Sequence, residues 1–162
     1  MKPAELRLES VLQQFGSMIS RIADNHEADP VLRQDLLQEI SLAVWKALKN
    51  FRREANVRTF VARIAHNRAV DHLIRQSRGR ERDSFDENVH VPHHKTDRLH
   101  EQMDLSAAMH RLPLGYRQVM GLMLEGFQQA KIAQALGLSE DAVAQRQSRG
   151  RQKLKDVLGE QA

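Results

Sequence analysis

The 162-residue sequence predicts an all-α protein made of two small helical domains joined by a polar linker. Aromatic residues make up only 4% of the chain and runs of β-branched residues are scarce, whereas strands are enriched in both. Apolar residues instead recur at three- and four-residue intervals, the spacing of one buried helix face. We therefore expect domains at residues 1–78 and 99–162. Residues 79–98 mix Arg, Asp, Glu, Ser and Pro without an apolar period, which is typical of a linker.

Two helices are expected in the N-terminal third. The first has apolar residues from Leu8 to Ile22, and Asp24-Asn25-His26 breaks this pattern. Asp29 then offers an N-cap and Pro30 a suitable first helical residue. The second helix carries an apolar stripe from Leu32 to Leu48. Its opposite face is polar and partly acidic, and such a face is commonly only solvated. This face includes Asp35, Gln38 and Glu39.

A third helix is expected to begin near Val57 or Arg58, after a loop at residues 50–57. Its outer surface is basic, and arginine forks suit phosphate contacts. Phe51 in the loop could stack on an unpaired base, or it could be a core residue beside a solvated helix; both interpretations remain open. The polar residues of this surface include Arg58, Arg63, Asn67, Arg68 and Arg75.

The second domain is expected to hold four helices. An apolar stripe from Leu105 to Leu112 ends at Pro113, and the next stripe ends at Gly126. A short helix then precedes Gly137, because glycine suits the left-handed C′ position. Ser139 can cap the helix that follows. Two helices joined by a tight glycine turn form a helix-turn-helix.

The last helix is basic, with no acidic residue between its cations. In a helix-turn-helix, the second helix enters the major groove and its N-terminal half meets base edges. The net charge of +4 and the pI of about 9.8 also suit a polyanionic partner. A basic helix can be merely solvated, but the turn and the charge together favour DNA binding. The candidate DNA-binding residues are Ser139, Arg146, Arg149, Arg151 and Lys153.

Composition excludes several classes of protein. The chain has no cysteine, so it can form neither a disulfide framework nor a cysteine-based zinc site, in keeping with a reducing cytoplasm. We find no catalytic constellation and no apolar run long enough for membrane insertion. We therefore expect a cytoplasmic protein that is not an enzyme.

The histidines give only a weak metal signal. His90, His93 and His94 lie in the linker, whereas a zinc site needs three or four converging ligands at rigid spacing. We expect no metal and no other cofactor. The remaining histidines are interpreted as ordinary surface or helix residues: His26, His66, His72, His100 and His110.

Two blocks of sequence carry a family resemblance. QDLLQEISLAVWKALKNFRREANVRTFVARIAHNRAVDHLIR resembles conserved region 2, and LPLGYRQVMGLMLEGFQQAKIAQALGLSEDAVAQRQSRGRQKLK resembles region 4, of bacterial RNA polymerase sigma factors of the extracytoplasmic-function (ECF) type. Many regulators share the second block, but both blocks in this order, joined by a polar linker, are specific. The recognition helix departs from the family pattern, with Ala142 and Ala144 where threonine and lysine are common.

The resemblance implies a role for each surface. Asp35, Gln38 and Glu39 would dock on the β′ clamp of core RNA polymerase. Phe51 and its loop would melt and read the −10 element with Arg58, Arg63, Asn67, Arg68 and Arg75. The helix from Ser139 would read the −35 element, with Arg146, Arg149, Arg151 and Lys153.

The implied function is promoter recognition, melting and transcription initiation. The implied partners are core polymerase (β′ clamp and β flap), promoter DNA and an anti-sigma factor. One alternative is a two-domain regulator that binds duplex DNA as a dimer without polymerase. A histidine-metal nuclease is another, and a chelator would test it.

Overall fold

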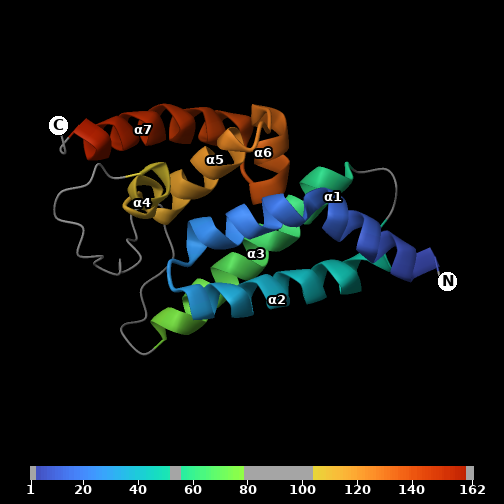
Figure 1. Ribbon diagram of the computed structural model, residues 1–162. Coiled ribbons are helices and arrows are strands. Elements are labelled where there is room, and N and C mark those ends of the chain that lie inside the picture. Colours follow the sequence, from blue (N-terminus) through green and yellow to red (C-terminus); the bar gives the residue numbers. More distant parts are fainter. Residues whose placement is uncertain (1–2, 52–55, 79–103, 160–162) are drawn as a thin grey trace.

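The structure is a computed structural model that describes residues 3–51, 56–78 and 104–159, with the side chains of residues 3–7 excepted. These ranges contain seven helices and no strand, which confirms the all-α prediction (Figure 1). The helices are α1 (Pro3–His26), α2 (Pro30–Leu48), α3 (Val57–Ser77), α4 (Leu105–His110), α5 (Leu114–Leu124), α6 (Gln129–Leu136) and α7 (Glu140–Gly159). The predicted linker at residues 79–98 lies outside the described residues.

Side-chain caps fix where α2 and α3 begin. Oδ1 of Asp29 accepts hydrogen bonds from the backbone amides of Val31 and Leu32, at 2.9 and 3.2 Å, so the predicted cap is confirmed. Asn56 caps α3 in the same way and accepts from the amide of Arg58 at 2.9 Å. Such caps supply acceptors to first-turn amides that have no partner within the helix.

Two predicted helix ends are wrong. α1 does not stop before Asp24 but continues to His26, because the polar residues of its last turn bond to the second half of the chain. α4 ends at His110, before Pro113, and Pro113 occupies the N-cap position of α5. The expected glycine turns are present, since Gly126 and Gly137 have φ of +87° and +67°.

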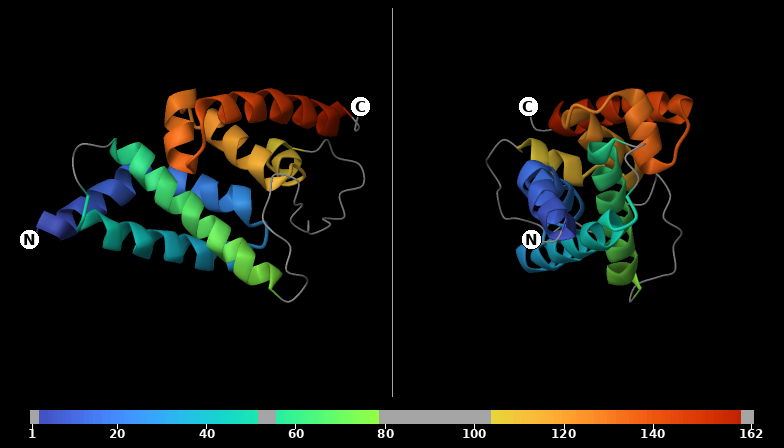
Figure 2. Two further views of the ribbon diagram at one scale, coloured as in Figure 1. Left: turned by 180° about the vertical axis from the view of Figure 1, so that it is seen from behind. Right: turned by 90° about the vertical axis from the view of Figure 1, so that its right-hand side faces the viewer.

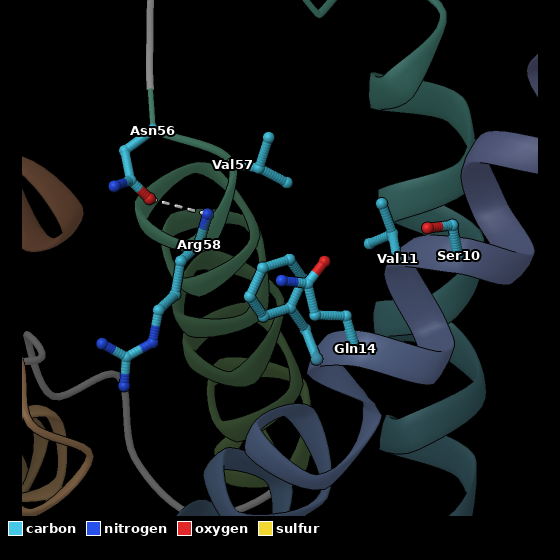
Figure 3. A pocket seen from close by; sticks show the side chains of 7 residues that line it. Ser10, Val11, Gln14, Asn56, Val57 and Arg58 are labelled. Atoms are coloured by element: carbon cyan, nitrogen blue, oxygen red, sulfur yellow. Dashed lines mark hydrogen bonds between the residues drawn. The ribbon is translucent and has the colours of Figure 1, made fainter.

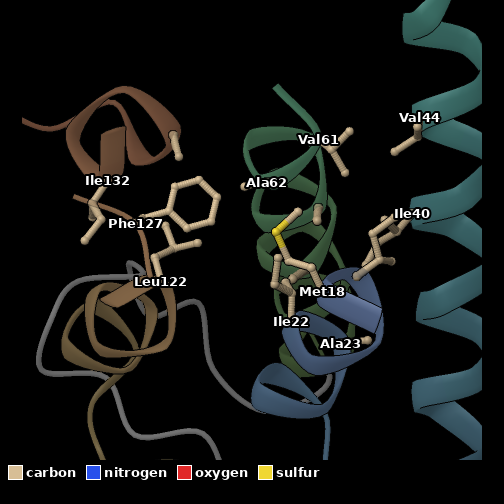
Figure 4. Close-up of a cluster of buried hydrophobic side chains, with 14 of the residues drawn as sticks. Met18, Ile22, Ala23, Ile40, Val44, Val61, Ala62, Leu122, Phe127 and Ile132 are labelled. Carbon is tan, nitrogen blue, oxygen red and sulfur yellow. The ribbon is translucent and has the colours of Figure 1, made fainter. Parts of the chain in front are cut away.

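The two halves of the chain pack on each other. Figures 1 and 2 show α4–α7 on one side of α1 and α3, with α2 on the other side. Figure 4 shows Leu122, Phe127 and Ile132 facing Met18, Ile22 and Ala62 across this junction. One cluster of buried residues contains side chains from both halves. The described helices thus form one body with a continuous core, an arrangement that the sequence alone does not reveal.

Within the described ranges, no helix combines the length and the apolar character needed to cross a membrane.

Candidate nucleic-acid interface

The predicted turn between α6 and α7 is confirmed in detail. Gly137 adopts the left-handed conformation, with φ of 67° and ψ of 35°, and the amide of Leu138 donates to the carbonyl of Ala133 at 3.0 Å. Oγ of Ser139 accepts from the amide of Ala142 at 3.1 Å. The side-chain amide of Gln129 donates to the carbonyl of Glu140 at 2.9 Å and links the two helices. These contacts set the angle at which α7 leaves the turn.

A glycine seats α7 closely on α5. Val143 and Gly150 are the buried residues of α7. A Cβ atom at Gly150 would lie 2.9 Å from Cγ of Met120 and 3.7 Å from Cβ of Tyr116. A real side chain there would have to displace these neighbours. The absence of a side chain therefore lets α5 support one face of α7, and the remaining faces stay available for contacts.

The basic residues of α7 fall into two groups. Arg149 is exposed and Arg146 is half-buried, and the exposed Ser139 precedes them at the start of the helix. Arg151 and Lys153 are also exposed but touch α5: Nη2 of Arg151 lies 3.4 Å from Sδ of Met123. Nζ of Lys153 lies 5.3 Å from the ring centre of Tyr116, a cation–π contact. The −35 residues predicted from the sequence thus lie along one helix, and the C-terminal pair is partly held in place.

The predicted −10 residues of α3 do not form one group. Arg63, Asn67 and Arg68 are exposed. The four-residue spacing places Arg63 and Asn67 on one face of the helix, and Arg68 lies about 100° further round it. Arg58 instead donates to the carbonyl oxygen of Glu125, and its guanidinium carbon lies 4.1 Å from the ring centre of Phe127. The guanidinium of Arg58 is therefore bound to the second half of the chain.

Arg75 joins the two surfaces that the resemblance distinguishes. Its Nη2 lies 2.5 Å from Oε2 of Glu39, an ion pair between α3 and α2. Asp35 and Gln38 are exposed on α2, whereas Glu39 is half-buried. The acidic face of α2 and the basic face of α3 consequently meet at this pair.

An open hollow of about 730 Å³ lies beside the start of α3. Figure 3 shows Gln14 and Val11 of α1 on one side of it and Asn56 and Val57 on the other, with the Arg58 side chain pointing away. Its lining residues are Ser10, Val11, Gln14, Phe15, Asn56, Val57 and Arg58. Residues 52–55 of the predicted −10 loop lie outside the described residues.

Phe51 is half-buried and packs on Phe60, with ring centres 4.7 Å apart. Of the two interpretations of this residue, the contact favours a ring that supports the start of α3.

Three of the histidines interpreted as ordinary surface or helix residues lie in helices but are buried. His26, His66 and His72 are 1%, 2% and 3% exposed. Nε2 of His72 lies 2.9 Å from Oε1 of Glu27, while neither ring nitrogen of His66 has a hydrogen-bond partner among the described residues. The residues that cover these histidines are distant in sequence, so the pattern of neighbouring residues did not indicate that they are buried. In the part of the chain that the structure describes, no group of three or more His, Asp or Glu residues could hold a metal ion; His90, His93 and His94 lie outside it.

Arg117 is a buried residue that the sequence reasoning missed. It is fully enclosed. Its guanidinium donates to the carbonyls of Leu112 at 3.0 Å and Asn25 at 3.3 Å. Burial lowers the pKa of Arg117 to about 10. In the sequence Arg117 resembles any other cation. The one signal for its burial is its place in an apolar stripe with Tyr116 and Met120.

Comparisons with known proteins agree with this architecture. A family model for Sigma-70 region 2 matches residues 11–79, and one for Sigma-70 region 4 matches residues 102–154. The ECF RNA polymerase sigma factor SigM of Mycobacterium tuberculosis is 29% identical over 126 residues, which cover 77% of this chain and 63% of SigM. The chain thus spans less than two thirds of the length of this relative.

Two solved structures share the fold. CnrH, solved in complex with the cytosolic domain of CnrY, is 22% identical with a TM-score of 0.71, covering 98% of this chain and 91% of CnrH. RpoE, solved in complex with the anti-sigma factor NepR from Bartonella quintana, is 19% identical with a TM-score of 0.74, covering 93% of this chain and 96% of RpoE. With the two region matches in order along the chain and the resemblance to SigM, this protein belongs to the sigma-70 family of bacterial RNA polymerase sigma factors, in its ECF group.

Proposed function

We propose that the chain binds core RNA polymerase and directs promoter recognition and melting, as a specificity subunit without catalytic activity of its own. The observation that carries this proposal is the pairing of two units in one chain. A helix-turn-helix presents the basic α7, and the α1–α3 half presents Arg63, Asn67 and Arg68 on α3. The matched sigma regions, residues 11–79 and 102–154, include all of α3 and most of α7.

The −35 element would be read by the N-terminal half of α7. Arg146 and Arg149 have the reach and the forked donors to bond guanine edges or phosphates. Gln145 is exposed beside them, and a glutamine amide can pair with adenine. Arg151 and Lys153 rest against α5, so they suit phosphate contacts that position the helix. Ala142 and Ala144 offer no polar contact, which moves base reading toward Gln145 and Arg146.

The −10 element would be opened and held by α3 and the loop before it. Extruding a base costs a few kcal/mol of unstacking energy, so the protein must offer the base compensating contacts. The hollow next to Asn56 and Gln14 has polar groups and the volume to hold one. Arg63, Asn67 and Arg68 on the exposed side of α3 would bind the adjacent phosphates.

Core polymerase would dock on the α2 face formed by Asp35, Gln38 and Glu39. This face is polar and partly acidic in a chain with a net charge of +4. α2 lies on the opposite side of the body from α4–α7 (Figure 2), so polymerase could bind it without covering α7. The same two surfaces, α2 and α7, are the ones that an anti-sigma partner would mask.

The experiment is co-purification with bacterial core RNA polymerase. The wild-type chain should bind core, and Asp35→Lys should weaken that binding several-fold. Exposed substitutions usually change stability by no more than about 0.5 kcal/mol, so the fold should be intact by circular dichroism. Glu9→Lys places the same charge reversal on an exposed position of α1 and should bind as the wild type does. If the wild-type chain does not bind polymerase but binds duplex DNA as a dimer, it is instead a transcriptional regulator that acts without polymerase.

A further inference from the structure

Three consecutive residues in the last turn of α1 contact α4 and α5. Nε2 of His110 lies 2.6 Å from the carbonyl oxygen of Asp24. The side-chain amide of Asn25 donates to the carbonyl of Arg117 at 3.2 Å, and Arg117 donates back to the carbonyl of Asn25 at 3.3 Å. Nε2 of His26 faces the side-chain nitrogen of Gln118. We name this set of contacts between Asp24–His26 and α4–α5 the clasp.

The hydrogen bonds of His26 define its neutral form. Nδ1 lies 2.7 Å from the carbonyl oxygen of Ile22, which can only accept, so Nδ1 carries the proton. Nε2 lies 3.3 Å from the side-chain nitrogen of Gln118, which can donate to it. A neutral imidazole with its proton on Nδ1 satisfies both partners. Because Gln118 belongs to α5, the Nε2 side of the ring depends on the two halves being closed.

The charges around His26 are unfavourable for a second proton. His66 packs edge-on against it with ring centres 5.1 Å apart, and the buried Arg117 and His110 add positive charge. Burial, followed by His66, lowers the pKa of His26 well below 6.5; burial also lowers the pKa of His66 to about 4. Within the described part of the chain, no carboxylate is hydrogen-bonded to His26. The nearby Glu27 pairs with His72.

We propose that the clasp is proton-sensitive: it holds α4–α7 against α1 while His26 is neutral and releases them when His26 is protonated on Nε2. Protonation turns the acceptor into a donor that faces the side-chain nitrogen of Gln118, itself a donor, and it places a cation beside Arg117 and His66. In the opened chain, Nε2 would face water instead. His72 and Glu27 both lie in the α1–α3 half, so their pairing is the same in either form. His110 can donate to the carbonyl of Asp24 whether or not it is charged.

His26 binds a proton less readily in the closed chain than in the opened chain, so acid favours opening. Burial and His66 lower the pKa of His26 in the closed form, and the opened form, in which water reaches Nε2, binds the proton more readily. At neutral pH neither form is protonated and the clasp is closed. Once the pH falls below the pKa of His26 in the opened form, the ratio of opened to closed chains rises by up to about tenfold per pH unit.

Opening would free a residue that the proposed function needs. Arg58 is bound to Glu125 and Phe127 at the same junction. Phe127 is only twelve residues from Ser139, so the start of α3 lies within roughly 40 Å of the start of α7 even if that segment were extended. Positions −35 and −10 of a promoter are about 25 base pairs apart. At about 3.4 Å per base pair, this is about 85 Å along B-DNA. The closed chain therefore cannot span both elements; this consequence alone rests on the proposed function.

The experiment measures the distance between the two halves in the full chain, without polymerase or DNA. Since the sequence has no cysteine, Gln13→Cys and Leu158→Cys introduce two labelling sites at exposed positions of α1 and α7. Energy transfer between donor and acceptor dyes should fall as the pH is lowered from about 7.5 to about 5.5, the range in which histidine titrates. Helix content by circular dichroism should stay constant.

Two substitutions separate the clasp from general acid effects. Gln118→Glu supplies a carboxylate that accepts from protonated Nε2, so this variant should stay closed at a pH that opens the wild type. Gln128→Glu makes the same change at an exposed position and should open as the wild type does. Gly121→Leu serves as a wedge, because a Cβ there lies 2.7 Å from Nδ2 of Asn25; it should be open at neutral pH. Gly16→Leu, where a Cβ meets no atom of the described residues within 4 Å, should remain closed.

Acid opening that Gln118→Glu suppresses and Gln128→Glu does not would support the clasp. Constant energy transfer across the pH range would overturn the proposal. Opening at the same pH in the Gln118→Glu variant, or opening accompanied by loss of helix, would overturn it too. Because none of these readouts involves polymerase, their failure is distinguishable from a failure of the polymerase-binding experiment.

Discussion

Gly150→Val should destabilise the helix-turn-helix half of the chain. Its Cβ would lie 2.9 Å from Cγ and 3.1 Å from Sδ of Met120, and overpacking of this kind costs about 1–3 kcal/mol. Valine regains only about 0.4 kcal/mol of helix propensity relative to glycine. We expect a net loss of about 2 kcal/mol, which corresponds to a fall in Tm of about 4–8 °C for a chain of this size. Binding to −35 DNA should also weaken, since α7 would move off α5.

Thermal and urea unfolding of the full chain measure this loss, with Gly16→Ala as the matched control. A Cβ at Gly16 meets no atom within 4 Å, so the control should be stabilised by about 0.5–1 kcal/mol through helix propensity alone. Met120→Ala would make room for the valine, so the double variant should lose less than the sum of the two single losses. If Gly150→Val unfolds at the wild-type temperature, α5 and α7 do not pack as described.

Three further predictions concern the proposed function. Arg146→Ala should cost about 1–3 kcal/mol on the matched −35 sequence and relax discrimination, whereas Lys153→Ala should weaken binding to all sequences and lower the salt slope by about one; affinities over a salt series on matched and scrambled DNA decide between them. Asn67→Ala should spare binding to core polymerase but impair open-complex formation, and normal permanganate reactivity of promoter thymines would contradict this. A pull-down from the source cell should recover an anti-sigma partner that covers the Asp35–Glu39 face or α7; recovery of the chain only free or only on polymerase would count against masking.

The sequence predicted the features that depend on neighbouring residues. The caps at Asp29 and Ser139 and the left-handed Gly137 each involve groups within a few positions of one another. The helices followed for the same reason, because an apolar stripe at helical spacing marks a buried face wherever that face packs. The basic run on α7 was visible as well, since charge is a property of composition.

The junction could not be predicted in this way. An apolar stripe shows that a helix buries one face but does not identify the helix that covers it. The contacts of Asn25 and His26 with Arg117 and Gln118 span 92 positions, so no local pattern reports them. The sequence also presents His26 and Arg117 as ordinary polar residues. Their burial becomes visible only when α4 and α5 close over the last turn of α1, and the same closure explains why α1 does not end at Asp24.

Arg58 links this closure to the proposed DNA contacts. In the closed chain its guanidinium donates to a neutral carbonyl of Glu125, whereas a DNA phosphate would offer it a charged acceptor and a stronger hydrogen bond. Promoter DNA that recruits Arg58 would therefore favour the opened form. By reciprocity, a closed clasp must weaken DNA binding by the same factor. Arg58→Lys tests this competition, since lysine lacks the planar fork that spans the Glu125 carbonyl and the Phe127 ring. The variant should open more readily in the energy-transfer assay while keeping a charge for phosphate, and an unchanged closed fraction would show that Arg58 does not hold the junction.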